Sequence, residues 1–216
     1  RNARMIVRDA RPAPIAEVSP GIMYVDLDRA TTAEFRAAVP KLAAARGLIF
    51  DLRGYPRQID ATEVLRHLIK EPSTSAQWHV PSVTRPDQDG FTFMRSPGWN
   101  LLPMEPHFAA PRVFLTGGGA ISYAESVMGI VEHYKLADIV GGATAGTNGN
   151  VNPFTAPGGF RISWTGMKVL KHDGSTHHGV GIAPTVPVER TIAGVLRGED
   201  EVLAAALKLL RGRQVH

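Results

Sequence analysis

The chain has 216 residues, of which 44% are hydrophobic and 20% charged, and its formal net charge is +4. This length allows one substantial domain or two small ones with a sizeable core. Because cysteine is absent, a disulfide framework, a thiolate metal site and a cysteine nucleophile are excluded. The lysines and arginines are scattered and form no stripe interleaved with aromatic residues, which gives no case for nucleic-acid binding. No apolar run approaches the ~20 residues that would span a bilayer.

The amino-terminal part of the chain predicts strands and a helix. Residues 5–9 alternate apolar and polar and predict a short strand, and residues 21–27 predict a second one. A helix is expected to begin after Thr31, because Thr31 and Glu34 have the spacing of a capping box. Residues 47–54 form a nearly continuous apolar run ending in a charged turn, as expected of a strand buried on both faces of a parallel sheet.

An irregular insertion is expected over residues 71–111, after a helix over residues 61–69. The insertion contains seven prolines, and the alternation of residues 91–93 favours a β-hairpin. Long segments of this kind lie at the mouth of a site more often than in a core. Its aromatic residues would either form an apolar wall for a peptide side chain or pack within the insertion; they are Trp78, Trp99, Phe91 and Phe93.

The carboxyl-terminal half continues the alternation of strands and helices. Residues 112–116 predict a buried strand that runs through three glycines into a helix with apolar residues at the spacing i, i+3, i+4, i+7. The remaining expected elements are a strand at 137–140, a loop at 141–150, a β segment at 160–170, a turn at 172–179, a short strand at 186–188 and a helix from Glu199. This order predicts an α/β domain.

Ser122 is the main candidate nucleophile, because it lies where the strand at 112–116 gives way to a helix. A hydroxyl there is held at the edge of the sheet, and the helix N-terminus stabilises negative charge beside it. The backbone N–H of Tyr123 can donate to an oxyanion. Two other interpretations stay open on this pattern alone. Ser122 would be a plain helix N-cap, or Gly117–Gly119 would hold a phosphate, although no Gly-Lys-Ser/Thr follows.

Four segments carry a family resemblance. They are residues 47–54 (GLIFDLRG), 122–125 (SYAE), 138–142 (DIVGG) and 178–184 (HGVGIAP). In this order they resemble the GLILDLRGN strand, the nucleophile motif, the strand before the second catalytic loop and the closing HGVGIxPD segment of the C-terminal processing peptidases (tail-specific proteases) and the related tricorn-type core peptidases. The resemblance covers residues 21–210.

The resemblance implies an α/β fold with a crotonase-like (ClpP-like) ββα core, interrupted by the Pro-rich insertion and by β-hairpin segments. It implies a serine peptidase that cleaves peptide bonds through an acyl-enzyme on Ser122. The Tyr123 N–H would hold the oxyanion, and an extended peptide or protein substrate would add to a strand edge. No metal or cofactor is expected. A periplasmic or secreted location is implied by the resemblance alone, and the oligomeric state is not indicated.

The expected general base is missing from the sequence. Tail-specific proteases pair their serine with a lysine, but the corresponding position here is Thr147. Tricorn-type peptidases use a histidine from an upstream segment, and the first histidine here is His67. Since a serine hydroxyl needs an adjacent base, we expect the base to lie in an N-terminal domain absent from this chain, and residues 1–216 to form a single catalytic domain. The start at Arg1, with neither an initiator Met nor an apolar leader, agrees with a fragment.

The loop after Arg53 also departs from the family, which has NxGG there and uses its backbone in the oxyanion hole. Residues 54–58 read GYPRQ, so the candidate second donor is the N–H of Arg57 or that of Gln58. Supporting roles near the substrate are assigned to Gly118, Gly119, Glu125, Thr147, Asn148 and His178.

Most of these assignments compete with a structural role. Thr147 or Asn148 would orient substrate or only stabilise the loop, a structural role is favoured for Glu125, and His178 would lie near Ser122 or on a surface hairpin. Residues 172–178 have the residue types of a metal site, but their Asp-Gly predicts a turn. Two rival functions are a catalytically silent binding member of the same fold, favoured by the missing base, and acyl-CoA chemistry, for which no well-placed carboxylate pair is found.

Overall fold

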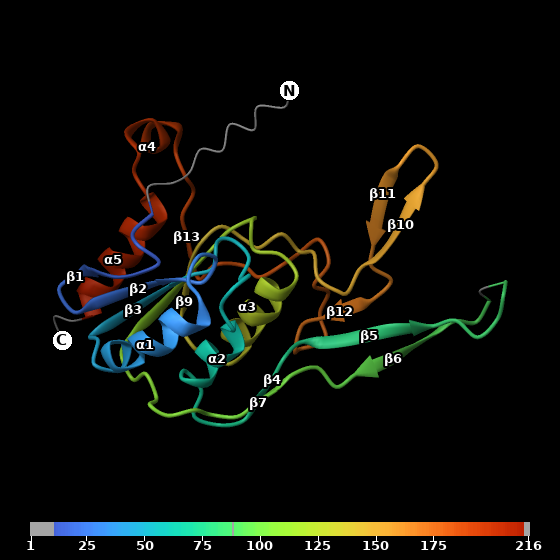
Figure 1. Cartoon of the computed structure of the whole chain (residues 1–216), viewed down its shortest axis with the longest axis horizontal. Helices are drawn as coiled ribbons and strands as arrows, with labels where there is room; N and C mark the ends of the chain where they lie inside the picture. Colours follow the sequence, from blue (N-terminus) through green and yellow to red (C-terminus); the bar gives the residue numbers. More distant parts are fainter. Residues whose placement is uncertain (1–10, 88, 214–216) are drawn as a thin grey trace.

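The computed structural model describes residues 11–87 and 89–213, and a six-stranded sheet lies at its centre (Figure 1). The strand order is β1-β2-β3-β8-β9-β13. Only the first pair is antiparallel, and every other neighbour is parallel. The strands are β1 (Ile15–Ser19), β2 (Ile22–Asp26), β3 (Gly47–Asp51), β8 (Arg112–Thr116), β9 (Asp138–Gly141) and β13 (Val186–Pro187).

Helices cover both faces of this sheet. One core contains side chains of α1 (Thr32–Ala43), α2 (Ala61–Arg66) and α3 (Tyr123–His133), and a second core contains those of α5 (Glu201–Arg213). The short helix α4 (Ile192–Arg197) lies apart from both layers. Parallel strands with helices on both faces are the architecture that the alternation of the sequence predicts.

The apolar run of β3 is explained by these two cores. Leu48 and Phe50 belong to the core under α1 to α3, whereas Ile49 between them belongs to the core under α5. Successive side chains of a strand point to opposite faces, so a strand covered on both sides must be apolar at every position. All five residues of β3 are buried, including Asp51 at its carboxyl end.

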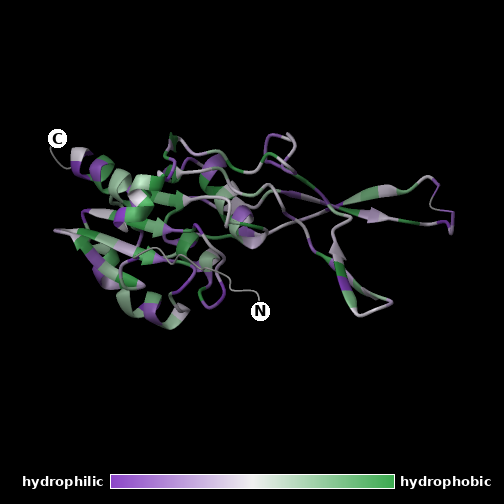
Figure 2. Ribbon diagram, turned by 90° about the horizontal axis from the view of Figure 1, so that it is seen from above, coloured by the Kyte–Doolittle hydropathy of each residue, from purple (hydrophilic) through white to green (hydrophobic). Residues whose placement is uncertain are grey.

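Two hairpins extend from this body as arms (Figures 1 and 2). The first pairs β5 with β6 and adds β12, in the order β12-β5-β6, and the second pairs only β10 with β11. A small two-stranded pairing of β4 and β7 joins the first arm to the body. The strands are β4 (Ser73–Thr74), β5 (Gln77–Ser82), β6 (Thr92–Ser96), β7 (Asn100–Leu101), β10 (Asn152–Ala156), β11 (Phe160–Trp164) and β12 (Lys168–Leu170).

The predicted elements of the sheet are confirmed over the described residues. The capping box of α1 is present: the Thr31 N–H donates to Glu34 Oε2 at 2.8 Å, and the Glu34 N–H donates to Thr31 Oγ1 at 3.2 Å. The strand expected at residues 5–9 lies outside the described residues.

Three expectations were wrong or incomplete. The helix expected over 61–69 ends at Arg66. The β segment expected over 160–170 is two strands in different sheets, because residues 165–167 turn away between them. The pattern also missed β1, α4 and β10. The last contains Pro153, which usually argues against a strand but is tolerated in this two-stranded hairpin.

Candidate functional site

Ser122 lies at a strained turn between a parallel strand and a helix. The chain leaves β8 through Gly117–Gly119, and Ser122 is the N-cap residue of α3. Its backbone angles are φ 50° and ψ −110°, a conformation that residues with a Cβ rarely adopt. Such strain costs on the order of 1–3 kcal/mol and persists only where surrounding contacts impose it. Those contacts identify what this turn is built around.

Two hydrogen bonds hold the Ser122 backbone in place. Its N–H donates to Thr147 O at 2.8 Å and to Glu125 Oε2 at 3.2 Å. The loop that carries Thr147 therefore lies directly beside the candidate nucleophile. No His, Lys, Asp or Glu side chain of the described residues is hydrogen-bonded to the Ser122 hydroxyl.

The next residue, Tyr123, presents a free backbone donor. Among the bonds of the described residues, its N–H has no acceptor, as expected for the first N–H of a helix. The Tyr123 hydroxyl accepts the Ala61 N–H at 3.1 Å, and its ring lies 5.4 Å from the ring of Trp99. Burial, with the nearby charge of Asp60, raises the pKa of Tyr123 to about 12. The phenol is thus a neutral structural group, and the free N–H is the chemically useful part of this residue.

Glu125 joins the Ser122 turn to the loop after β9. Its side chain is buried, and each of its oxygens accepts two hydrogen bonds. Oε1 accepts from Thr144 Oγ1 at 2.7 Å and from the Gly146 N–H at 2.6 Å. Oε2 accepts from the Thr147 N–H at 2.8 Å and from the Ser122 N–H. This saturation favours the structural role over an acid–base one.

The histidines near the closing segment lie behind the Ser122 turn. His177 is buried with Nε2 3.3 Å from Glu125 Oε1, and His178 Nε2 accepts the Val169 N–H at 3.1 Å. Burial acts to raise the pKa of Glu125, but His177 and the hydroxyl of Thr144 outweigh it, so this pKa lies below its ordinary value. His178 thus supports β12 rather than the space in front of Ser122.

Asn148 is buried and fixes the same loop to the helix. Its Nδ2 donates to Ser126 Oγ at 3.0 Å, and its Oδ1 accepts the Gly149 N–H at 2.7 Å. Both capacities of the amide are used inside the protein. The structural alternative for Asn148 is therefore the one that its contacts favour.

A cavity of about 300 Å³ opens in front of Ser122. None of the described residues that line it is a His, Lys, Asp or Glu. They are Tyr55, Trp78, Trp99, Ser122, Tyr123, Ser126, Asn148, Gly149, Asn150 and Met167. Trp78 and Trp99 were expected as an apolar wall, and they pack edge to face with their ring centroids 5.4 Å apart. The cavity suits an apolar group and offers no base to the serine.

The loop after Arg53 lies against the glycine run, although Arg57 itself does not line the cavity. Arg57 places its guanidinium 5.5 Å from the centre of the Tyr55 ring, and Tyr55 lies 6.2 Å from the ring of Tyr123. The Arg57 N–H has no acceptor among the described residues. The Arg57 N–H therefore stays a predicted second oxyanion donor. Its connection to the site is the Tyr55 ring, which contacts both the Arg57 guanidinium and the Tyr123 ring.

Gly119 is the closest contact between the two loops, and this gives a first testable prediction. A Cβ there would lie 2.5 Å from Arg53 O, whereas a Cβ at Gly117 would meet nothing within 4 Å. We expect Gly119→Ala to lower the free energy of unfolding by about 1–3 kcal/mol, because backbone must move to admit the methyl group. Thermal unfolding measures this, with Gly117→Ala as the matched control. Equal melting temperatures for the two variants would contradict the close approach.

A buried ionic network lies beneath the loop after Arg53. Asp26 and Asp51, at the carboxyl ends of β2 and β3, are fully buried. Asp51 Oδ2 accepts from Arg53 Nη2 at 2.6 Å and from the Tyr24 hydroxyl at 2.7 Å. Arg53 also donates to both oxygens of Asp200, each at 2.8 Å, just before α5. Burial acts to lower the pKa of Arg53, but Asp51 and Asp200 outweigh it and raise the pKa. Arg53 thus stays charged and ties the loop to the sheet and to the start of α5.

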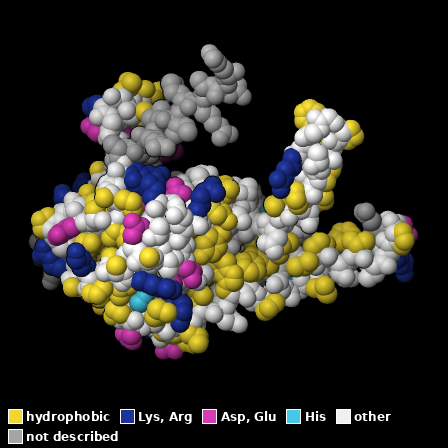
Figure 3. Space-filling view, viewed as in Figure 1, with side chains coloured by type: hydrophobic (Ala, Val, Ile, Leu, Met, Phe, Trp, Pro, Cys, Tyr) yellow, Lys and Arg dark blue, Asp and Glu magenta, His cyan; other side chains and the backbone are white. Residues whose placement is uncertain are grey.

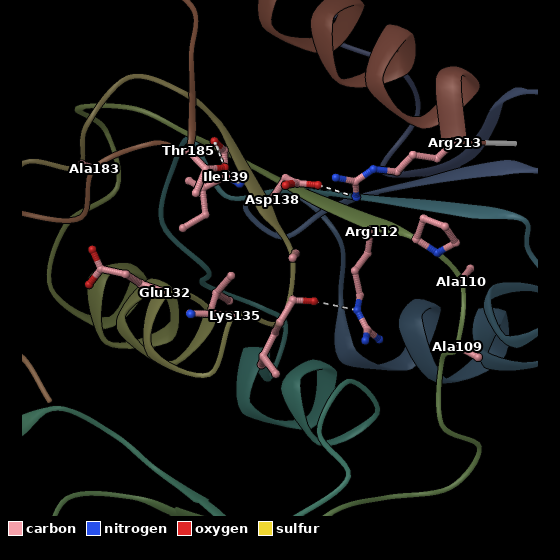
Figure 4. Close-up of a pocket in the computed structure, with 14 residues that line it drawn as sticks. Ala109, Ala110, Arg112, Glu132, Lys135, Asp138, Ile139, Ala183, Thr185 and Arg213 are labelled. Carbon is pink, nitrogen blue, oxygen red and sulfur yellow. Dashed lines mark hydrogen bonds and ion pairs between the residues drawn. The ribbon is translucent and has the colours of Figure 1, made fainter. Parts of the chain in front are cut away.

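A larger hollow of about 670 Å³ lies at the amino ends of β8 and β9, away from Ser122 (Figure 4). Arg213 forms an ion pair with Asp138 at 2.6 Å there, and Arg112 Nε donates to Leu136 O at 2.7 Å. None of the predicted site residues lines this hollow.

Within residues 11–87 and 89–213, no group of three or more His, Asp or Glu side chains is placed to hold a metal ion. No described helix is long and apolar enough to cross a membrane.

Sequence reasoning missed four residues that line the cavity, three of them from segments distant from Ser122 and one, Ser126, a helical turn further along α3. Tyr55, Ser126, Asn150 and Met167 line the Ser122 cavity although no motif singled them out. Met167 comes from the turn between β11 and β12, and its Sδ accepts the Asn150 N–H at 3.1 Å. The departure of the Gly54–Gln58 loop from the family pattern was the one signal near Tyr55.

A serine on a strained strand-to-helix turn, followed by a free helix N–H, is typical of serine hydrolases. The sequence model of peptidase family S41 matches residues 21–188. The chain therefore belongs to peptidase family S41, a family of serine peptidases.

Solved structures agree in fold. A candidate peptidase from Parabacteroides merdae gives a TM-score of 0.72 at 18% identity, over 91% of this chain and 63% of its own. Mature CPAF gives a TM-score of 0.66 at 14% identity, with 88% of this chain and 50% of CPAF covered. The tricorn protease gives a TM-score of 0.57 at 14% identity, with 89% of this chain and 18% of the tricorn chain covered. At these identities the likeness concerns the fold alone, and the chain spans less than two thirds of each of these structures. A comparison with curated proteins gave no match.

Proposed function

We propose that this chain is the nucleophile-bearing part of a serine peptidase that cleaves peptide bonds through an acyl-enzyme on Ser122. The observation that carries the proposal is the strained Ser122 turn with the free Tyr123 N–H beside it. The ββα core is the crotonase-like (ClpP-like) one, and residues 1–216 act as a single catalytic domain with residues 71–111 as an insertion. Membership of family S41 supports peptide or protein substrates.

Two features of the chain would stabilise the oxyanion. The Tyr123 N–H lies at the N-terminus of α3, where the helix dipole favours negative charge. The second donor is the N–H of Arg57, in the loop packed against Gly119. The four hydrogen bonds that the Glu125 carboxylate accepts fix the Ser122 turn before substrate arrives. Removing one donor of such a pair costs about 10²–10³ in rate.

The general base comes from a segment outside this chain. Among the described residues, no His, Lys, Asp or Glu lines the Ser122 cavity, and Thr147 occupies the place of the lysine in the tail-specific branch. The nearby histidines face other groups: His177 Nε2 lies 3.3 Å from Glu125 Oε1, and His178 Nε2 accepts the Val169 N–H. These observations support the tricorn-like branch, with a histidine brought from elsewhere in the protein.

A catalytically silent member that binds peptides is the second candidate function. The absent base and the altered loop at residues 54–58 favour it. Such a protein would keep the cavity and the aromatic wall of Trp78 and Trp99 while losing acyl transfer. Reaction with an active-site probe separates the two functions, because only an activated serine reacts quickly.

Labelling by a fluorophosphonate tests the proposal. We expect a longer form that includes the upstream sequence to be labelled, and Ser122→Ala to reduce labelling below about a thousandth. The chain of 216 residues is expected to label slowly on its own. Ser175→Ala, on an exposed turn, is the control and should label as wild type. A longer form that resists labelling, or labelling that survives in Ser122→Ala, overturns the proposal.

A further inference from the structure

The hairpin of β10 and β11 has one face made almost wholly of apolar side chains. Opposed residues of an antiparallel pair share a face, and the register places Phe154 opposite Ile162 and Asn152 opposite Trp164. Phe160 continues this face opposite Ala156. The rings of Phe154 and Trp164 meet edge to face, with centroids 5.5 Å apart. We define these six residues as the apolar hairpin face.

The other face of the hairpin is polar. It carries Pro153, Thr155, Arg161 and Ser163, from the alternate positions of the same two strands. Apart from Asn152 and Pro153, the alternation of apolar and polar residues is the pattern of a sheet with one buried and one solvated side. The residue pattern of the hairpin therefore indicates that its apolar face is covered by another surface.

Nothing in the described structure covers the apolar hairpin face. Phe160 is 71% exposed, Trp164 49%, Phe154 48% and Ile162 44%. Neither strand is hydrogen-bonded to any other described strand, and the arm projects from the body, as Figure 3 shows. An isolated two-stranded hairpin is marginal in water, so this one needs a partner to be well ordered.

We propose that the apolar hairpin face is a homodimer interface, covered by the same face of a second copy of this chain. The face carries no charged side chain, so a copy turned by a two-fold axis meets it without repulsion, as an isologous contact requires. A substrate would cover the face only during turnover. Apolar faces of this kind rarely stay exposed on monomers, which favours a lasting partner.

The size of the face suits a reversible dimer. Its four large side chains expose apolar surface on the order of 400 Å², since a buried aromatic residue contributes about 150–250 Å². Two such faces together give on the order of 800 Å² of apolar surface, below the ~1,200 Å² of stable interfaces and in the range of weak, reversible ones. Val151, 62% exposed beside the first strand, adds to it. A dimer with micromolar dissociation is expected.

The pairing also bears on the Ser122 cavity. Asn150 and Met167 flank the hairpin, bond to each other and line that cavity. A partner that orders the hairpin therefore orders one wall of the cavity. The interface itself involves no group of the proposed reaction.

Sedimentation velocity over a concentration series tests this. We expect the full chain to move from the mass of one copy to that of two as its concentration rises through the micromolar range. Phe154→Ser combined with Trp164→Ser should stay at one copy at every concentration. The matched control, Thr155→Ala combined with Ser163→Ala on the polar face, should dimerise as wild type. Circular dichroism is expected to show both variants folded, because all four side chains are exposed in the monomer.

Three results overturn the proposal. They are a wild-type chain that remains one copy at the highest concentration, a dimer that survives in the Phe154/Trp164 variant, and binding of the wild type to phosphatidylcholine vesicles without self-association, which would assign the face to lipid. The measurement needs no catalytic activity, so its result does not depend on the proposed function.

Discussion

Glu125→Ala is expected to lower the free energy of unfolding by about 3–5 kcal/mol, the range for breaking a buried charged contact. The side chain is 1% exposed and accepts four hydrogen bonds. Three of the four donors are backbone N–H groups, those of Ser122, Gly146 and Thr147. The Ser122 N–H keeps Thr147 O as an acceptor, but the Gly146 and Thr147 N–H groups lose theirs, and each buried donor left unpaired costs about 1–3 kcal/mol. Urea unfolding followed by circular dichroism measures the loss.

Glu125→Gln distinguishes charge from shape. In the carboxylate each oxygen receives two donors, so the amide must turn an NH₂ group toward two of them and cannot satisfy the site. We therefore expect this variant to lose more than half as much stability as the alanine one. Glu132→Ala, on the same helix in a partly exposed ion pair with Lys171, should cost less than about 1 kcal/mol. A Glu125→Gln protein as stable as wild type would contradict the saturated site.

The functional consequence follows from the strain at Ser122. The hydrogen bond from the Ser122 N–H to Glu125 helps to hold a strained backbone conformation that Ser122 would otherwise leave. Their loss should let the turn relax, so labelling of Ser122 in a longer, active form should fall even at temperatures where the variant is folded. This links the stability of the loop at residues 144–148 to the chemistry proposed for the serine.

The sequence alone predicted the sheet and the position of Ser122 well, because both depend on local patterns. Continuous apolar runs marked β3 and β8, and the glycine run marked the turn. The partners of Glu125 could not be predicted in the same way. Thr144 and His177 come from segments far along the chain, and no spacing rule relates them.

The aromatic and polar lining of the cavity shows the same limit. Trp78 and Trp99 were weighed between an apolar wall for a peptide side chain and packing within the insertion; the two rings pack on each other and also line the Ser122 cavity, and the role toward a peptide stays a prediction. Tyr55 and Met167 were missed because each lies in a turn, where side-chain direction follows from tertiary contacts. The apolar hairpin face was not predicted from the sequence, because Pro153 argued against the strand β10 and because β11 and β12 were expected as one continuous β segment.

Asp51→Ala is expected to cost about 3–5 kcal/mol of unfolding free energy, for a different reason from Glu125. Its removal leaves Arg53 with Asp200 alone and Tyr24 with one weaker contact, to Asp26 at 3.2 Å. Arg53 O then loses its fixed place against Gly119. Urea unfolding at neutral pH measures the loss. Glu199→Gln, in an exposed pair with Arg197, is the control and should unfold at the same urea concentration as wild type.

The Asp51 carboxyl group also makes stability depend on pH, and the direction of this dependence follows from its pKa. Burial acts to raise the pKa of Asp51, but Arg53, Arg11 and the Tyr24 hydroxyl outweigh it, so the pKa lies below its ordinary value. A carboxyl group with a lowered pKa contributes stability that is present above the unfolded value, about 3.9, and is lost as pH falls toward the folded value. We therefore expect wild type to lose stability steeply below about pH 4, and Asp51→Asn to lose it less steeply there because this group no longer titrates. Parallel acid profiles for the two proteins would show that the Asp51 carboxylate is not held by the cations around it, and Arg53 would then need another anchor for the loop behind Ser122.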